Sequence, residues 1–218
     1  MKRTLFVIAS FAWAISIICV VSIFAGEGRF VPLPKPQVDG GRPLMRVLKD
    51  RSSTRSFGPE KLSVQVLSNL LWAAFGINRP DTGKRTAPTA VNRQEIDIYV
   101  ATADGLYLYE AKRQALKLLL SGDIRALTGR QDFVKEAPVN LIYVADFSRM
   151  GTAPKEDKEI YSAADTGFIS QNVYLYCASE RLATVVRGSI DKQALAKAMN
   201  LRPYQKIILA QSVGYHRK

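Results

Sequence analysis

The sequence predicts an α+β fold built on a mixed or antiparallel sheet with flanking helices. Apolar residues recur at helical spacing over 62–75 and again along a long stretch at 157–181. Apolar residues alternate with other residues over 96–100, and a turn at 103–105 leads into a second strand at 106–109. A hairpin joins antiparallel strands, and the helices and strands are not in strict alternation. We therefore favour α+β over a doubly wound parallel sheet.

The elements before the hairpin follow from proline placement and apolar spacing. Three prolines within 30–36 cannot donate backbone hydrogen bonds, so this stretch is expected to be an extended spacer outside helix and sheet. The apolar spacing over 44–48 predicts a short helix ending near Arg51. In the helix over 62–75, Ser63 is the expected N-cap and Gly76 stands just after the end.

After that helix, residues 76–90 are rich in loop-forming types and are expected to line a site. The remaining predicted elements are a helix over 111–120, an inner strand over 139–145, a strand over 182–186, a helix over 191–199 and a final strand over 206–213.

The first 28 residues are interpreted as a targeting segment. Lys2 and Arg3 precede a run without charge from Leu5 to Ala25. The run is longer than the apolar core of roughly 7 to 15 residues in a signal peptide, and it fits an anchor of about 20 residues. A cleaved signal and a retained anchor both stay open. Positive charge before the run predicts a body outside the cytoplasm, periplasmic or secreted, held at the inner membrane if the segment is retained.

The chain is thus divided into a signal peptide or membrane anchor at 1–28, a Pro/Gly-rich extended linker at 29–43 and one globular domain at 44–218. The formal net charge of +12 calls for an acidic partner such as nucleic acid, an anionic membrane surface or a phosphorylated cofactor. A generally basic surface would give the same charge, so charge alone does not choose.

Cysteine and histidine are too few for several kinds of site. The two cysteines, Cys19 and Cys177, exclude an internal disulfide framework, and Cys177 has no second ligand at metal-binding spacing. The single histidine, His216, is the third residue from the C-terminus. We therefore predict no metal site and no catalytic dyad based on histidine.

The segment Arg51-Ser52-Ser53-Thr54-Arg55-Ser56-Phe57 indicates phosphate chemistry. It places two guanidinium groups and four hydroxyls in adjacent positions directly after a predicted helix. Arginine binds phosphate through two parallel hydrogen bonds, and serine hydroxyls with loop N–H groups can complete the site. A solvated basic turn is the alternative reading of the same residues.

Two later motifs add to this one. Together the motifs comprise Arg51, Ser53, Arg55 and Phe57; Ala87, Pro88, Thr89, Asn92 and Gln94; and Gly167, Gln171 and Asn172, followed by Leu182 and Gly188. With all three in this order, the sequence resembles the nitroreductase family over roughly residues 33–215. The proline-rich entry and the loop at Gly76 look like the shorter, dehydrogenase-like branch of that family.

The resemblance implies an FMN-dependent homodimer with the flavin at the subunit interface and the long helix in that interface. The implied cofactor-binding residues are Arg51, Ser52, Ser53 and Arg55 at the phosphate; Pro88, Thr89 and Asn92, of which Thr89 and Asn92 act from the partner subunit; main-chain groups near Arg187 and Gly188 at the flavin N5 side; and Arg217. The implied activity is an oxidoreductase that moves hydride or electrons through flavin N5, to or from a small aromatic or heterocyclic substrate. The donor is NAD(P)H or another reductant. The flavin carries the chemistry, so no catalytic side chain is implied.

The sequence departs from the family pattern in four places. Thr89 stands for serine, Ser52 for a second basic residue, and Arg181 for a glycine at the exit of the long helix. Longer relatives carry a further basic segment that helps bind phosphate, for which Arg217 is the candidate substitute.

Two other functions stay open: a flavin-binding protein without turnover, and a basic protein that binds membrane surfaces or nucleic acid. Aromatic residues interleaved with basic ones are scarce in this sequence, which argues against nucleic-acid binding. Tyr174 and Tyr176 are expected to be core or dimer contacts, and Asp157, Glu159 and Asp165 are not assigned as an acid–base pair.

Overall fold

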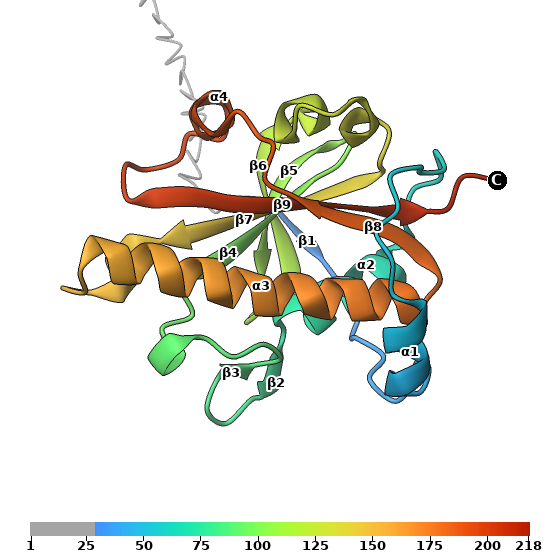
Figure 1. Cartoon of the computed structure of the whole chain (residues 1–218), viewed down its shortest axis with the longest axis horizontal. Coiled ribbons are helices and arrows are strands. Elements are labelled where there is room, and N and C mark those ends of the chain that lie inside the picture. Colours follow the sequence, from blue (N-terminus) through green and yellow to red (C-terminus); the bar gives the residue numbers. More distant parts are fainter. Residues whose placement is uncertain (1–28) are drawn as a thin grey trace, which may run out of the picture.

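The structure, a computed structural model, describes residues 29–218. Its main sheet has seven strands in the order β1-β6-β5-β4-β7-β9-β8, and each neighbouring pair is antiparallel (Figure 1). The strands are β1 (Phe30–Pro32), β4 (Ile96–Ala101), β5 (Gly105–Glu110), β6 (Ala115–Ser121), β7 (Val139–Asp146), β8 (Leu182–Arg187) and β9 (Gln205–Tyr215). A second, two-stranded sheet pairs β2 (Ile77–Arg79) with β3 (Lys84–Arg85).

Helices cover both faces of the main sheet. The α-helices are α1 (Leu44–Asp50), α2 (Val64–Phe75), α3 (Lys155–Ser179) and α4 (Lys192–Ala198), and the short 3-10 helices are η1 (Ala90–Asn92), η2 (Arg125–Thr128), η3 (Asp132–Lys135) and η4 (Phe147–Met150). The long helix α3 lies along one face with α2, and α4 lies on the other (Figure 1). The predicted α+β architecture with a long helix is therefore confirmed.

Alternation along the central strands explains the two cores. Ile98 and Val100 of β4 pack with α2 and α3, while Tyr99 and Ala101 pack on the side of α4. All eight residues of β7 are buried, because this strand lies in the middle of the sheet with helices on both faces. The short apolar run that predicted an inner strand at 139–145, interrupted only by Asn140, has this cause.

Several local predictions are confirmed with shifted bounds. Ser63 caps α2, accepting a hydrogen bond from the Val66 N–H at 3.2 Å. The predicted hairpin is the β4–β5 pair, in which Tyr99 faces Leu108. The strand at 182–186, the helix at 191–199 and the final strand at 206–213 correspond to β8, α4 and β9.

The predicted helix over 111–120 is wrong. Residues 111–114 form a tight turn that Gln114 closes with a φ of 45°, and β6 then pairs with β5. The apolar residues of this stretch satisfy helical and strand spacing alike. Cross-strand pairs decide between them, since Leu116 faces Tyr109 and Leu118 faces Tyr107.

The proline-rich stretch also differs from the expectation that it lies outside the sheet. Phe30–Pro32 forms β1, which pairs with β6. Proline is compatible with this place because β1 is an edge strand, whose outer N–H positions need no partner.

The predicted targeting segment, residues 1–28, lies outside the described residues. Within residues 29–218, each helix is too short or too polar to cross a lipid bilayer.

Candidate functional site

The loop that follows α1 contains the predicted phosphate-binding residues and is fixed to the edge of the main sheet. The Thr54 N–H donates to the Thr184 carbonyl of β8 at 2.9 Å. Phe57 is fully buried and forms a bridge with His216, just after β9. Gly58 then donates its N–H to the Tyr215 carbonyl at 2.9 Å. The loop is thus held between β8 and the end of β9.

Tyr174 of α3 connects this loop to β8. Its hydroxyl lies 2.8 Å from the Ser53 Oγ and accepts a hydrogen bond from the Val186 N–H at 3.0 Å. The Arg51 guanidinium carbon lies 5.3 Å from the centre of the Tyr174 ring, within cation–π range. Helical spacing had indicated a core or dimer contact for Tyr174, and only the fold places its hydroxyl in the loop.

The loop is suited to an anion. Within residues 29–218, neither Arg51 nor Arg55 makes an ion pair. Ser52, Ser53 and Arg55 are exposed. A cavity of about 360 Å³ adjoins Ser52 and is also lined by Tyr174, Thr184, Arg181 and His216. Guanidinium groups without an ion pair among the described residues, beside exposed hydroxyls, are what a phosphate group requires.

Arg181 stands where the family pattern has glycine, and the chain keeps the backbone shape of a glycine there. Its φ is 56°, in the left-handed region through which chains commonly leave a helix. The residue is exposed, so its side chain meets no steric conflict. The departure at Arg181 therefore does not redirect the chain into β8.

The Arg187 side chain serves the interior. Arg187 is only 6% exposed and donates to the Thr128 carbonyl, to Asn140 Oδ1 at 2.6 Å and to Ser212 Oγ at 3.2 Å. These acceptors are neutral, and burial lowers the pKa of Arg187 to about 10. Gly188, the next residue, is exposed, whereas Arg187 is paired with Ala210 of β9.

Arg217 lies beside the phosphate loop but is engaged. Its Nε donates to the Phe57 carbonyl at 3.2 Å, and its Nη2 forms a 2.8 Å ion pair with Glu136. Arg217 therefore lies where the predicted phosphate-binding role needs it, but the Glu136 carboxylate already compensates part of its charge.

The second predicted group, Pro88, Thr89 and Asn92, lies on a strained loop. Thr89 Oγ1 accepts the Gln94 N–H at 3.0 Å, and the Thr89 carbonyl accepts the Asn92 N–H at 2.9 Å. Three residues without a glycine's freedom adopt positive φ: Val91 at 46°, Asn92 at 56° and Gln94 at 50°. Such backbone persists only where surrounding contacts enforce it.

Asp165 of α3 provides one of those contacts. Its Oδ2 accepts the Ala90 N–H at 2.9 Å, and its side chain is buried. Glu95, which follows the loop, is also buried beside Asp165, and neither of its carboxyl oxygens has a hydrogen-bond partner within residues 29–218. The sequence pattern assigns no role to either carboxyl group, because no spacing rule pairs Glu95 with Asp165.

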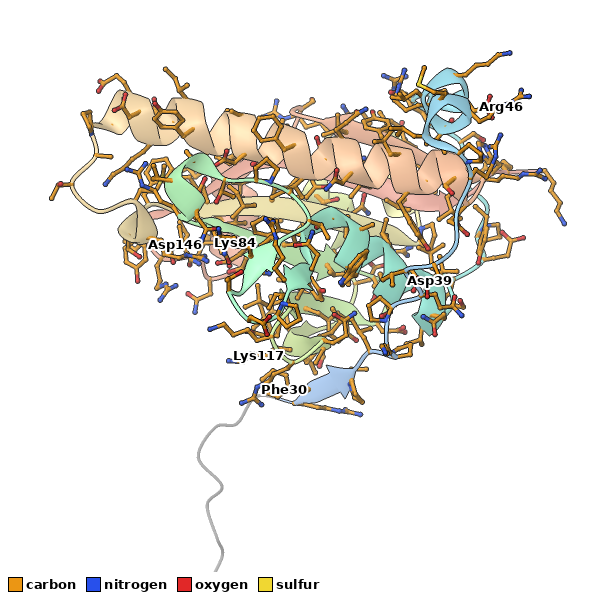
Figure 2. The ribbon with its side chains drawn as sticks, turned by 90° about the horizontal axis from the view of Figure 1, so that it is seen from below. Phe30, Asp39, Arg46, Lys84, Lys117 and Asp146 are labelled. Carbon is orange, nitrogen blue, oxygen red and sulfur yellow. The ribbon has the colours of Figure 1, made fainter. Side chains whose placement is uncertain are left out.

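One chain does not bring the two predicted groups together. The phosphate loop contacts α3 at Tyr174 and the strained loop contacts it at Asp165. Nine residues of helix separate these positions by about 14 Å. In Figure 2, Arg46 of α1 lies beside one end of α3, and Asp146 and Lys84 lie towards its other end.

A sequence profile described as the nitroreductase family matches residues 48–215. This chain belongs to the nitroreductase family. The resemblance inferred from the three motifs is thereby confirmed, and members of this family are generally FMN-dependent oxidoreductases. Among the described residues, no cluster of three or more His, Cys, Asp or Glu residues could hold a metal ion.

Known relatives agree with this membership. A protein of Methanocaldococcus jannaschii described as a nitroreductase is 28% identical over 176 residues, which cover 76% of this chain and 88% of the relative. A Ralstonia eutropha crystal structure described in the same way is 43% identical, with a TM-score of 0.84 over 87% of this chain and 90% of that one. A third, from Desulfovibrio desulfuricans in complex with FMN, shares the fold at 22% identity, with a TM-score of 0.60 over 82% of this chain and 89% of that one.

The buried Glu95 makes stability depend on pH. Burial, and then the charge of Asp165, raise the pKa of Glu95 from 4.5 to about 7. Between these values the folded state keeps a proton that the unfolded state has released, so the free energy of unfolding falls as pH rises and levels off above about 7. The free energy of unfolding of Glu95→Gln should not show this fall. Relative to the wild type, the variant should therefore become more stable by roughly 3 kcal/mol as the pH rises across this range, measured by urea unfolding at several pH values.

The matched control is Asp104→Asn, which removes an exposed carboxyl group paired with Lys61. Its free energy of unfolding should run parallel to that of the wild type. A constant difference between Glu95→Gln and the wild type at all pH values would contradict the prediction.

Proposed function

We propose that this nitroreductase-family protein binds FMN and is an oxidoreductase that passes hydride or electrons between a reductant and a small aromatic or heterocyclic substrate. The observation that carries the proposal is the loop from Arg51 to Ser56, which presents exposed hydroxyls and guanidinium groups without an ion pair in residues 29–218, beside the outer strand β8. When bound, FMN would supply the electron transfer through its N5 position.

The chain's own residues bind and orient the cofactor in this proposal. Arg51 and Arg55 hold the phosphate by charge, and Ser52 and Ser53 add hydroxyl hydrogen bonds. The main chain at Arg187 and Gly188 faces the ring, and the buried Arg187 side chain keeps that end of β8 in place. The 43% identity to the Ralstonia eutropha structure supports transfer of the family's activity, while the substrate and the reductant stay open.

A homodimer completes the site in this proposal. The helix α3 exposes Ile160 by 64% and Phe168 by 49%, and α1 exposes Met45 by 75%. Exposed apolar side chains of this size on neighbouring helices suit a protein interface. With a second copy across α3, Pro88, Thr89 and Asn92 of the partner subunit would meet the Arg51 loop of the first, which removes the separation of about 14 Å along the helix.

We also propose that the body lies outside the cytoplasm, with residues 1–28 acting as its signal or anchor. The support is the uncharged run behind Lys2 and Arg3. In that case the reductant, whose identity is open, must be available outside the cytoplasm.

Removal of a phosphate-binding arginine should weaken FMN more than riboflavin. We expect Arg51→Ala or Arg55→Ala to raise the FMN dissociation constant by about ten- to a hundredfold, the worth of one charge-assisted hydrogen bond. Riboflavin lacks the phosphate, so its affinity should hardly change. Flavin fluorescence titration measures both, with Arg113→Ala, an exposed arginine on another loop, as the control. Equal losses for the two flavins would show that the arginines act elsewhere than at the phosphate.

Mixed dimers test whether the site is shared. A chain with Arg51→Ala and a chain with Asn92→Ala each spoil both sites of their own homodimer. In the mixed dimer, the intact Arg51 of one chain faces the intact Asn92 of the other, so one site in two should regain FMN affinity. Differently tagged chains, co-expressed and purified through both tags, allow the flavin content to be measured. A mixed dimer without any restored site would mean that each site uses residues of one chain.

The location is tested by fractionating cells that express the full chain with a C-terminal tag. We expect the tag to be in the membrane or periplasmic fraction and open to protease added outside the inner membrane, because positive charge holds the N-terminus inside. A variant with Lys2 and Arg3 changed to Glu is the matched control, since it should insert poorly. A wild-type chain recovered only from the cytoplasm would contradict the proposal.

A further inference from the structure

Glu95 is an anomaly in this fold. It has no exposed surface, and neither carboxyl oxygen has a hydrogen-bond partner within residues 29–218. A carboxylate buried without a partner is strongly unfavourable, and a buried carboxylic acid is far less so. The surroundings of Glu95 therefore favour the protonated group.

The charged groups around Glu95 do not neutralise it. Asp165 faces it from α3, and Arg149 approaches from η4. Arg149 is already paired with Asp97 of β4 and lies 3.8 Å from Asp146 at the end of β7, while its Nη1 donates to the Gln94 carbonyl at 2.9 Å.

The groups beyond Arg149 are also committed. Asp146 forms a 3.2 Å ion pair with Arg202, and Arg85 of β3 donates to the Gln94 side chain at 2.8 Å and to the Phe75 carbonyl at 2.9 Å. No cation of the described residues pairs with Glu95 or Asp165. The two carboxyl groups can therefore carry one negative charge at far lower cost than two.

Asp165 uses its charge to hold the strained loop. Its Oδ2 accepts the Ala90 N–H, the first residue of η1, immediately before the positive φ of Val91 and Asn92. A hydrogen bond from a backbone N–H to a carboxylate is stronger than one to a neutral acceptor. A proton on Glu95 leaves Asp165 as the charged member of the pair, and loss of that proton sets two buried charges against each other.

We propose that Asp165 positions the loop of residues 88–92 for the partner subunit's flavin, and that the proton held by Glu95 keeps Asp165 in that role. The inference rests on the proposed function, since the loop has this task only if FMN binds in a shared site. Its consequence is an FMN affinity that is high in mildly acidic solution and falls as Glu95 ionises. Asp165 and Glu95 are positioning residues, because neither needs to touch the flavin.

The test is the FMN dissociation constant of the full-length protein from about pH 5.5 to about pH 8.5, measured by flavin fluorescence. Loss of one charge-assisted hydrogen bond predicts a rise of about tenfold for the wild type. Glu95→Gln keeps a neutral group of the same shape, so its FMN affinity should stay high and nearly independent of pH. Asp165→Ala should bind weakly at every pH. The control Asp104→Asn should follow the wild type.

Asp165→Asn is a second variant in case Asp165→Ala does not fold. The asparagine oxygen can still accept the Ala90 N–H, but the repulsion with Glu95 is gone, so the pH dependence should shrink as in Glu95→Gln. A purely structural role would lower thermal stability without flattening this profile. If Glu95→Gln or Asp165→Asn kept the wild-type pH profile, the inference would be overturned. If the wild type bound no FMN at any pH, the proposed function itself would fail, and that outcome is separate from tight binding without pH dependence.

Discussion

The packing of α3 against the main sheet is the constraint on which the candidate site depends. Tyr174 and Asp165 both lie on this helix, one hydrogen-bonded to the phosphate loop and the other to the strained loop. A helix has a set rise per residue, so α3 holds the two points of attachment about 14 Å apart along its axis. In the proposed homodimer, the exposed apolar residues of α1 and α3 provide the surface on which the two chains meet.

The outer strand β8 is held in place from both sides. On its outer side, the Thr184 carbonyl accepts the Thr54 N–H at 2.9 Å and the Val186 N–H donates to the Tyr174 hydroxyl at 3.0 Å. Here Arg187 reaches from the end of β8 to Thr128, Asn140 and Ser212, all of them buried. Every one of these acceptors is neutral, and through them the arginine joins β8 to three separate elements, η2, β7 and β9. The neighbouring Gly188 is left exposed on a strand end that cannot shift freely.

The two points of attachment on α3 differ in their electrostatics. Near Tyr174, the Arg51 guanidinium makes no ion pair within residues 29–218, which suits an anion from solution. Near Asp165, two carboxyl groups are buried without an ion-pair partner among the same residues, which suits a retained proton. Positive charge is thus available where a phosphate is proposed to bind, and a retained proton reduces the negative charge of the carboxyl pair beside the strained loop.

Short-range pattern in the sequence determined most of the elements and the family. Ser63 predicts the start of α2, the short apolar run at 139–145 predicts an inner strand, and the three motifs indicate the nitroreductase family. Each of these signals lies within one segment, where residue spacing carries the information.

The tertiary structure decided what depends on contacts between distant segments. Pairing with β5 makes 115–121 a strand despite its helical spacing. The position of β1 at the edge of the sheet allows it to contain a proline. The packing of α3 brings Asp165 close to Glu95, which lies 70 positions earlier in the sequence. Such contacts leave no periodicity in the sequence, because the free energy that selects them comes from packing and burial across the folded chain.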